Sequence, residues 1–194
     1  MISSDPSTDF KDLLHRDTNL YVDENIMLTV ASEKFSPTLY EIINFNREYF
    51  SQFMAWPSFV NHENDTSNFL NSCLRAHKNN ESKTYVILFN NNPVGLLSFN
   101  SIDKGNKTAY IGYWLDIRAQ GKGIIRRAIK TLIDYYASHC IIKRFVIKCS
   151  TVNQKSNKVA QHCGFIYEGT LRKAEYLNGI FHDQNIYSWI SPNM

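Results

Sequence analysis

Hydrophobic and polar positions along the chain follow two different periods, and these periods predict alternating strands and helices. From 125 to 136 the apolar residues recur at helical spacing, which predicts a helix with one buried face. Short β-branched and aromatic runs bounded by turn residues predict strands. The expected strands are 25–30, 84–89, 94–99, 109–115, 145–149, one starting at 165–167, and 185–190; the expected helices are 36–50, 63–77, 124–139 and 152–163.

The order of these elements indicates the fold class. Asn90 to Pro93 form a turn-rich tetrad between two strands, which is typical of an antiparallel hairpin. The second half then alternates strand, helix, strand and helix. Together they predict an α/β (α+β) protein with a mixed sheet covered by helices.

The chain length and the polar first residues indicate the domain organisation. With 194 residues, of which 43% are hydrophobic, the chain suits one compact domain. Residues 1–18 are polar, so we expect a flexible tail or linker there and a single domain over 19–194. A tail of this kind suits either a domain cut from a longer, two-domain protein or the frayed end of a complete one.

A glycine-containing turn lies between the strand 109–115 and the helix 124–139. It reads Arg118-Ala119-Gln120-Gly121-Lys122-Gly123. Glycines let a backbone approach a ligand closely, and the N-terminus of the following helix directs free N–H groups and a positive dipole at an anion. The turn therefore suits a phosphate site, although an ordinary solvated turn has the same composition. The spacing fits neither a Walker loop nor a dinucleotide fingerprint.

Charge favours a compact anionic ligand over a nucleic acid. The formal net charge is only +3, and the basic residues crowd together only on one helix, at Lys122, Arg126, Arg127 and Lys130. A nucleic-acid binder more often has a wide basic face.

Cysteine and hydropathy patterns exclude several classes. The four cysteines form no CxxC pair and the six histidines no HExxH motif, so we expect a reduced, cytoplasmic protein without a metal. No apolar run reaches the about 20 residues of a membrane span, and the N-terminus has no signal-peptide core.

A second polar cluster opens the helix 152–163. It consists of Asn153, Ser156 and Asn157, shortly before Gly164 and Phe165. Helix capping explains Asn153 or Ser156 taken singly. It does not explain the joint order of strand, RxxGxG turn, helix, strand, NxxS, helix and Gly-Phe strand.

This joint order resembles the GNAT superfamily of acetyl-CoA-dependent N-acetyltransferases, over residues 25–190. Within it, the segments 106–115 (NKTAYIGYWL) and 144–149 (RFVIKC), with Glu168-Gly169 and Ala174-Glu175, resemble the ribosomal-protein N-terminal serine acetyltransferases. The resemblance implies a mixed, mostly antiparallel sheet flanked by helices, and acetyl-CoA as cosubstrate.

The resemblance also implies the residues that bind acetyl-CoA. The backbone from Gln120 to Ile125 holds the pyrophosphate, and Lys122 and Arg126 add positive charge. The strand end at Trp114 and Leu115 pairs with the pantetheine arm in the manner of an added strand, and Asn153 contacts the same arm. The implied cosubstrate site is Trp114, Leu115, Gln120, Gly121, Lys122, Gly123, Ile124, Ile125, Arg126 and Asn153.

Two further residues match catalytic positions of the family. Glu175 matches the base that takes the proton of the attacking amine, and Ser156 the group that protonates or hydrogen-bonds the leaving thiolate. Without the resemblance, surface solvation for Glu175 and capping for Ser156 would explain them. Cys149 lies in an apolar strand, which favours a buried structural thiol over a covalent nucleophile.

The acceptor is suggested by aromatic residues. Trp56 precedes Pro57 in an expected loop and Phe69 lies among polar residues, so either can stand at a pocket mouth and stack on a planar ligand. In the ribosomal enzymes the position of Phe69 is not typically aromatic. Here the chain is more similar to the acetyltransferase domains that give self-immunity to microcin C, where two aromatics clamp a nucleobase.

The sequence therefore predicts acetylation of the α-amino group of a processed aminoacyl-nucleotide toxin. N-terminal serine acetylation of a ribosomal protein is the alternative within the family, and a noncatalytic acyl-CoA-binding module is the alternative outside enzymes. No nucleic-acid or membrane partner is expected.

Overall fold

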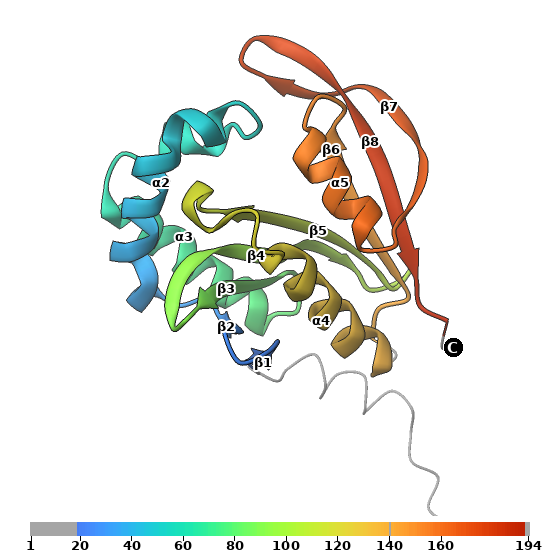
Figure 1. The fold of residues 1–194 in the computed structure, drawn as a ribbon, viewed down its shortest axis with the longest axis horizontal. Helices are drawn as coiled ribbons and strands as arrows, with labels where there is room; N and C mark the ends of the chain where they lie inside the picture. The colour runs from blue at the N-terminus through green and yellow to red at the C-terminus, as the bar shows by residue number, and fades with distance from the viewer. Residues whose placement is uncertain (1–18, 140, 193–194) are drawn as a thin grey trace, which may run out of the picture.

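A computed structural model describes residues 19–139 and 141–192 and consists of one sheet with helices on both faces (Figure 1). In this part of the chain, eight strands form the sheet in the order β1-β2-β3-β4-β5-β6-β8-β7. The mixed α/β class expected from the sequence is confirmed. The tail expected at 1–18 lies outside the described residues.

The first half forms an antiparallel meander with two helices. The hairpin turn falls on Asn90 and Asn91, both in the left-handed region at φ of 49° and 63°, as a two-residue turn requires. The elements are β1 (Leu20–Tyr21), β2 (Ile26–Val30), the 3-10 turn η1 (Glu33–Phe35), α2 (Ser36–Ser51), the 3-10 turn η2 (Trp56–Phe59), α3 (Glu63–Lys78), β3 (Lys83–Phe89) and β4 (Asn92–Asp103).

The second half supplies a parallel strand pair, which then separates. β5 and β6 pair in parallel from Thr108 with Arg144 to Ile111 with Ile147, after which both strands continue without pairing to each other. The elements are β5 (Thr108–Leu115), η3 (Ile117–Ala119), α4 (Ile124–Ser138), β6 (Arg144–Ser150), α5 (Gln154–His162), β7 (Ile166–Leu177) and β8 (Ile180–Ile190).

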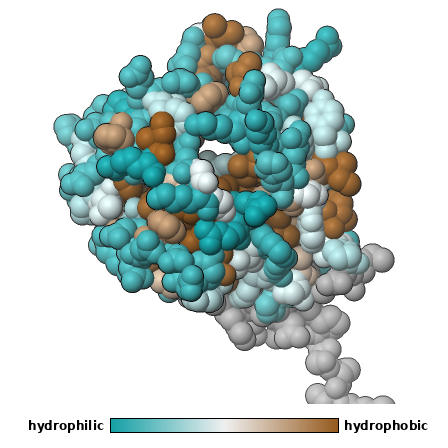
Figure 2. All heavy atoms as spheres, in the orientation of Figure 1, coloured by the Kyte–Doolittle hydropathy of each residue, from teal (hydrophilic) through white to brown (hydrophobic). Residues whose placement is uncertain are grey.

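Each face of the sheet packs its own core. Successive side chains of β3 point to opposite faces of the sheet. Tyr85 and Ile87 belong to the core under α4, whereas Val86 and Leu88 pack with residues of α2 and α3. The two cores keep the helix pairs on opposite faces. In the same orientation, Figure 2 shows a hollow between α2 and α5.

Several expectations about the elements need correction. β4 runs from Asn92 to Asp103, beyond the expected 94–99, and β8 begins at Ile180 and not at 185. The strand expected to start at 165–167 is β7, which continues to Leu177; most of its side chains are exposed, and its bulges and the left-handed Lys173 interrupt the alternation. Trp56 opens a 3-10 turn and not a loop. α5 begins at Gln154, with Asn153 as its N-cap, and ends at His162.

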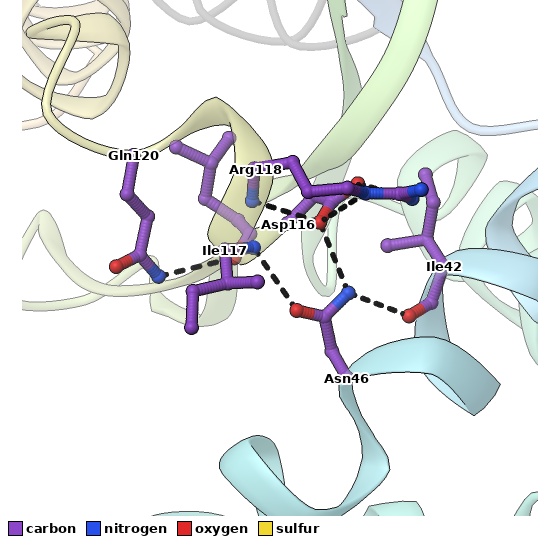
Figure 3. A network of polar contacts seen from close by, with 7 residues as sticks. Ile42, Asn46, Asp116, Ile117, Arg118 and Gln120 are labelled. Carbon is purple, nitrogen blue, oxygen red and sulfur yellow. Dashed lines mark hydrogen bonds and ion pairs between the residues drawn. The ribbon is translucent and has the colours of Figure 1, made fainter.

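A buried asparagine ties α2 to the segment after β5 (Figure 3). Asn46 is 2% exposed; its side-chain amide donates to the Ile42 carbonyl at 2.8 Å and to Asp116 Oδ1 at 3.1 Å. Its oxygen accepts the Ile117 N–H at 3.0 Å. Burial opposes ionisation of Asp116, but hydrogen bonds from Arg118 and Asn46 outweigh it and hold the pKa of Asp116 below its usual value. This network fixes the direction in which the chain enters the glycine turn.

We expect Asn46→Ala to lower the free energy of unfolding by about 2 kcal/mol, because it removes a hydrogen bond from the buried Asp116 carboxylate and the acceptor of the part-buried Ile117 N–H. Urea denaturation measures the change. Asn44→Ala is the matched control, since Asn44 lies on the same helix and is exposed. Equal stability of the two variants would contradict this role for Asn46.

Candidate active site

One large cavity, of about 1510 Å³, opens where β5 and β6 separate. α2, η2 and α3 line it from one side, and the glycine turn, α4 and α5 from the other. Thirteen of the fourteen site residues predicted from the sequence line this cavity: Trp56, Phe69, Trp114, Leu115, Gln120, Gly121, Gly123, Ile124, Ile125, Arg126, Asn153, Ser156 and Glu175.

The glycine turn has the backbone of an anion site. Gly121 and Gly123 both adopt left-handed conformations, at φ of 78° and 69°. A Cβ at either position meets no atom within 4 Å, so conformation, not space, makes glycine favourable here. Gly123 is the N-cap of α4 and no side chain caps this helix. The turn therefore presents helix N–H groups to the cavity, as a pyrophosphate requires.

Lys122 is the predicted residue that the structure places elsewhere. Its ammonium lies 5.2 Å from the centre of the Phe89 ring, and Lys122 is not among the residues that line the cavity. Its ammonium therefore lies over Phe89 and not at the cavity where the sequence predicts a phosphate site. Arg126, one helical turn further, does line the cavity.

A bridge across the cavity was not foreseen from the sequence. Lys155 at the start of α5 donates to Gln120 Oε1 at 2.9 Å, and its ammonium lies 5.0 Å from the centre of the Tyr49 ring on α2. Gln120 donates in turn to the Tyr49 hydroxyl at 3.3 Å. No motif announces this contact, because its members lie far apart in the sequence.

The end of β5 has a free edge toward the cavity. After Ile111 this strand pairs with β4 and no longer with β6, so from Gly112 to Leu115 no strand covers the edge that faces β6. The Gln120 amide donates to the Leu115 carbonyl at 3.4 Å. Trp114 packs against Phe50 and Trp56 at ring-centre distances of 5.3 and 5.9 Å. An extended ligand can pair with this edge as an added strand.

Ser156 combines capping with a second contact. Its backbone N–H donates to Asn153 Oδ1 at 3.1 Å, so capping by Asn153 is confirmed. Its hydroxyl lies 2.8 Å from the hydroxyl of Tyr113, and burial raises the pKa of that phenol. Sequence reasoning missed Tyr113, although it is the neighbour of Trp114. The pair places two neutral hydroxyl groups beside the opening.

Glu175 reaches the cavity from the β7–β8 hairpin. It is half-buried on β7, opposite His182 on β8. The base of the hairpin is held by Arg144, which donates to Glu168 at 2.8 Å, and by Ser188, which donates to the same carboxylate at 2.6 Å. These two bonds lower the pKa of Glu168 to about 2.

Cys149 is 7% exposed, as expected of a structural thiol. Burial raises the pKa of this thiol, which disfavours the reactive thiolate.

In the described part of the chain, no three His, Cys, Asp or Glu side chains are grouped to hold a metal ion. Over the same residues, no helix has both the length and the apolar composition of a bilayer span.

The two aromatics predicted for the acceptor lie on the α2–α3 side of this cavity. Trp56 is half-buried beside Phe50 and Trp114, and Phe69 on α3 is 51% exposed. Both line the cavity that contains the glycine turn. The cavity can therefore hold the planar group of one ligand and the anionic group of another.

Comparisons with known proteins agree with this geometry. Residues 27–166 match the family model of the acetyltransferase (GNAT) domain. The ribosomal-protein-serine acetyltransferase of Escherichia coli K12 is 41% identical over 169 residues, 87% of this chain and 94% of that protein.

Two solved structures are also similar. The microcin C7 self-immunity acetyltransferase MccE, solved with acetyl-CoA and AMP, is 46% identical, with a TM-score of 0.86 over 87% of this chain and 94% of that one. The ribosomal L7/L12 α-N-protein acetyltransferase RimL, solved with coenzyme A, is 39% identical, with a TM-score of 0.87 over 89% and 98%. With a phosphate turn, an open strand edge and these relatives, the chain belongs to the GNAT acetyltransferase family and uses acetyl-CoA as its acetyl donor.

Proposed function

We propose that this N-acetyltransferase acetylates the α-amino group of an aminoacyl nucleotide of the processed microcin C type and so confers self-immunity. One observation carries the proposal: Trp56 and Phe69 line the same cavity as the phosphate turn. Stacking on a nucleobase uses exposed aromatic faces of this kind. MccE, which is 46% identical, was solved with AMP as well as acetyl-CoA.

The residues around the opening supply proton transfer for direct attack of an amine on the thioester carbonyl. Glu175 takes the proton of the amine, directly or through a water molecule, as the new C–N bond forms. Ser156, with the Tyr113 hydroxyl at 2.8 Å, gives a hydrogen bond or a proton to the sulfur as the C–S bond breaks. The backbone from Gln120 to Ile125, with Arg126, holds the pyrophosphate, and Trp114, Leu115 and Asn153 hold the pantetheine arm.

The ribosomal alternative rests on a separate observation, the 41% identity over nearly the whole serine acetyltransferase of E. coli. An N-terminal peptide has no nucleobase that could stack on Phe69. Purified protein offered aspartyl-sulfamoyl adenosine and a peptide with an N-terminal serine, each with acetyl-CoA, decides between the two acceptors. Acetylation of the peptide alone would reject the detoxification role, and no turnover with any amine would favour a noncatalytic acyl-CoA-binding module. In either enzymatic role we expect a cytoplasmic protein.

We expect Phe69→Ala to raise the KM for the nucleotide acceptor about tenfold, since base stacking on an aromatic contributes roughly 1–3 kcal/mol. The KM for acetyl-CoA stays unchanged. Steady-state kinetics with each substrate varied in turn measures both constants. Phe181→Ala, at an exposed phenylalanine that does not line the cavity, is the matched control. Equal losses for both substrates would indicate a folding defect and not an acceptor contact.

We expect Glu175→Gln to lower kcat by about 100-fold, which is the usual range for loss of a general base. Calorimetric titration should give an unchanged affinity for coenzyme A, because the carboxylate lies on the hairpin and not in the phosphate turn. Retained turnover together with intact coenzyme binding would remove Glu175 from the mechanism.

A further inference from the structure

Lys148 is a cation in the cavity to which neither the fold nor the proposed chemistry gives a role. It lies on β6, is exposed, and lines the cavity. Its ammonium lies 5.0 Å from the centre of the Tyr110 ring on β5. Among residues 19–139 and 141–192, no carboxylate lies within ion-pair distance of it. An anion that enters the cavity therefore meets no competing partner at this ammonium.

Lys148 and the helices that follow the phosphate turn lie on opposite faces of the sheet. On β6, Phe145, Ile147 and Cys149 belong to the core packed against α4, so the alternating Lys148 projects from the opposite face. Tyr110 alternates in the same way with Ala109 and Ile111 on β5. Other basic side chains of the cavity, Arg126 and Lys158 among them, lie on α4 and α5. Lys148 thus faces the acceptor half of the cavity.

A second donor lies on the neighbouring strand. Asn100 sits at the bulge of β4, and its side-chain oxygen accepts a hydrogen bond from the Ser98 hydroxyl at 2.6 Å. Its NH₂ group has no hydrogen-bond acceptor among the described residues. The Asn100 amide lies directly over Gly112, where a Cβ would come within 2.3 Å of the Asn100 nitrogen. The absence of a side chain at 112 is what lets this amide lie over β5.

The two donors flank the same part of β5. Tyr110 pairs with Ser101 of β4 on one side and with Val146 of β6 on the other. Asn100 directly precedes Ser101 on β4, and Lys148 follows two residues after Val146 on β6. The ammonium lies near Tyr110 and the amide lies over Gly112, two residues further along β5 on the same face. An ammonium and an amide NH₂ over one strand face suit a carboxylate, which accepts through two oxygens.

We infer that Lys148 and Asn100 form a carboxylate subsite over Tyr110 and Gly112, which selects amine acceptors with an acidic side chain beside the acetylated amine. The inference rests on the proposed α-amine acetylation and names the class of first residue that the site prefers. The positive charge of Lys148 also disfavours protonation of a nearby amine, which helps to keep the nucleophile neutral. Lys148 therefore determines specificity, while Glu175 remains the base.

The test compares isosteric acceptors that differ only in charge. Aspartyl- and asparaginyl-sulfamoyl adenosine form one pair, and tetrapeptides Asp-Ala-Ala-Ala and Asn-Ala-Ala-Ala the other. We expect kcat/KM to favour the aspartyl member roughly tenfold in whichever pair is acetylated, because a charge-assisted hydrogen bond to a carboxylate is lost with the amide. Turnover of neither pair would be a failure of the proposed function; turnover without a preference for aspartyl would overturn the subsite alone.

Substitutions then assign the preference to its residues. Lys148→Met should abolish the aspartyl preference and Lys148→Glu should reverse it, both with an unchanged KM for acetyl-CoA. Asn100→Ala should reduce the preference in part. Lys158→Met removes another cavity lysine, on α5, and should leave the aspartyl-to-asparaginyl ratio as in the parent protein. A full aspartyl preference in Lys148→Met, with thermal unfolding like that of the parent, would overturn the assignment.

Discussion

The separation of β5 and β6 is the constraint on which the rest of the site depends. The strands pair for four residues, up to Ile111 and Ile147, and each then continues with its facing edge unpaired by a strand. Side chains reach the two ends, from Gln120 to the Leu115 carbonyl and from Asn157 to the Ser150 carbonyl. Backbone N–H and C=O groups at such an edge need partners from water or a ligand. The separation thus creates both the cavity and the backbone edge that an extended ligand can use.

The same separation lets one strand serve two substrates. Along β5, Tyr113 and Leu115 face the side of α4 and α5, whereas Gly112 and Trp114 face the side of α2 and α3. The phosphate turn, Ser156 and Arg126 lie on or beside the helices of the first side, and Trp56, Phe69 and Lys148 line the cavity from the second. The attacking amine and the thioester can therefore approach from opposite faces and meet where the sheet is open. The buried Asn46 network maintains this geometry, because it sets the path from β5 into the turn.

Sequence reasoning succeeded where the chemistry is local. The turn that leads into α4, the Asn153 cap and most helix bounds each depend on residues within a few positions of one another, so the pattern contains the information. Contacts between distant segments escaped it. The Tyr113–Ser156 pair, the Lys155 bridge and the stacking of Lys148 on Tyr110 depend on strand register and on the opening of the sheet. Lys122 shows the same limit, since its place in the motif gave no information on the direction of its side chain, which lies over Phe89.

This difference explains why the donor is better determined than the acceptor. The half of the cavity that we propose for acetyl-CoA is built from one turn and the helices that follow β5 and β6. The relatives MccE and RimL were solved with acetyl-CoA and coenzyme A, respectively. The half that we propose for the acceptor is assembled from η2, α3 and single side chains of several strands, such as Asn100 on β4, Lys148 on β6 and Glu175 on β7. A few substitutions there can change the acceptor without disturbing the sheet, because Phe69, Asn100 and Lys148 are exposed and belong to neither core. Identities of 39–46% to enzymes with two kinds of acceptor thus fix the reaction, and the charge and aromatic character of this half must decide the substrate.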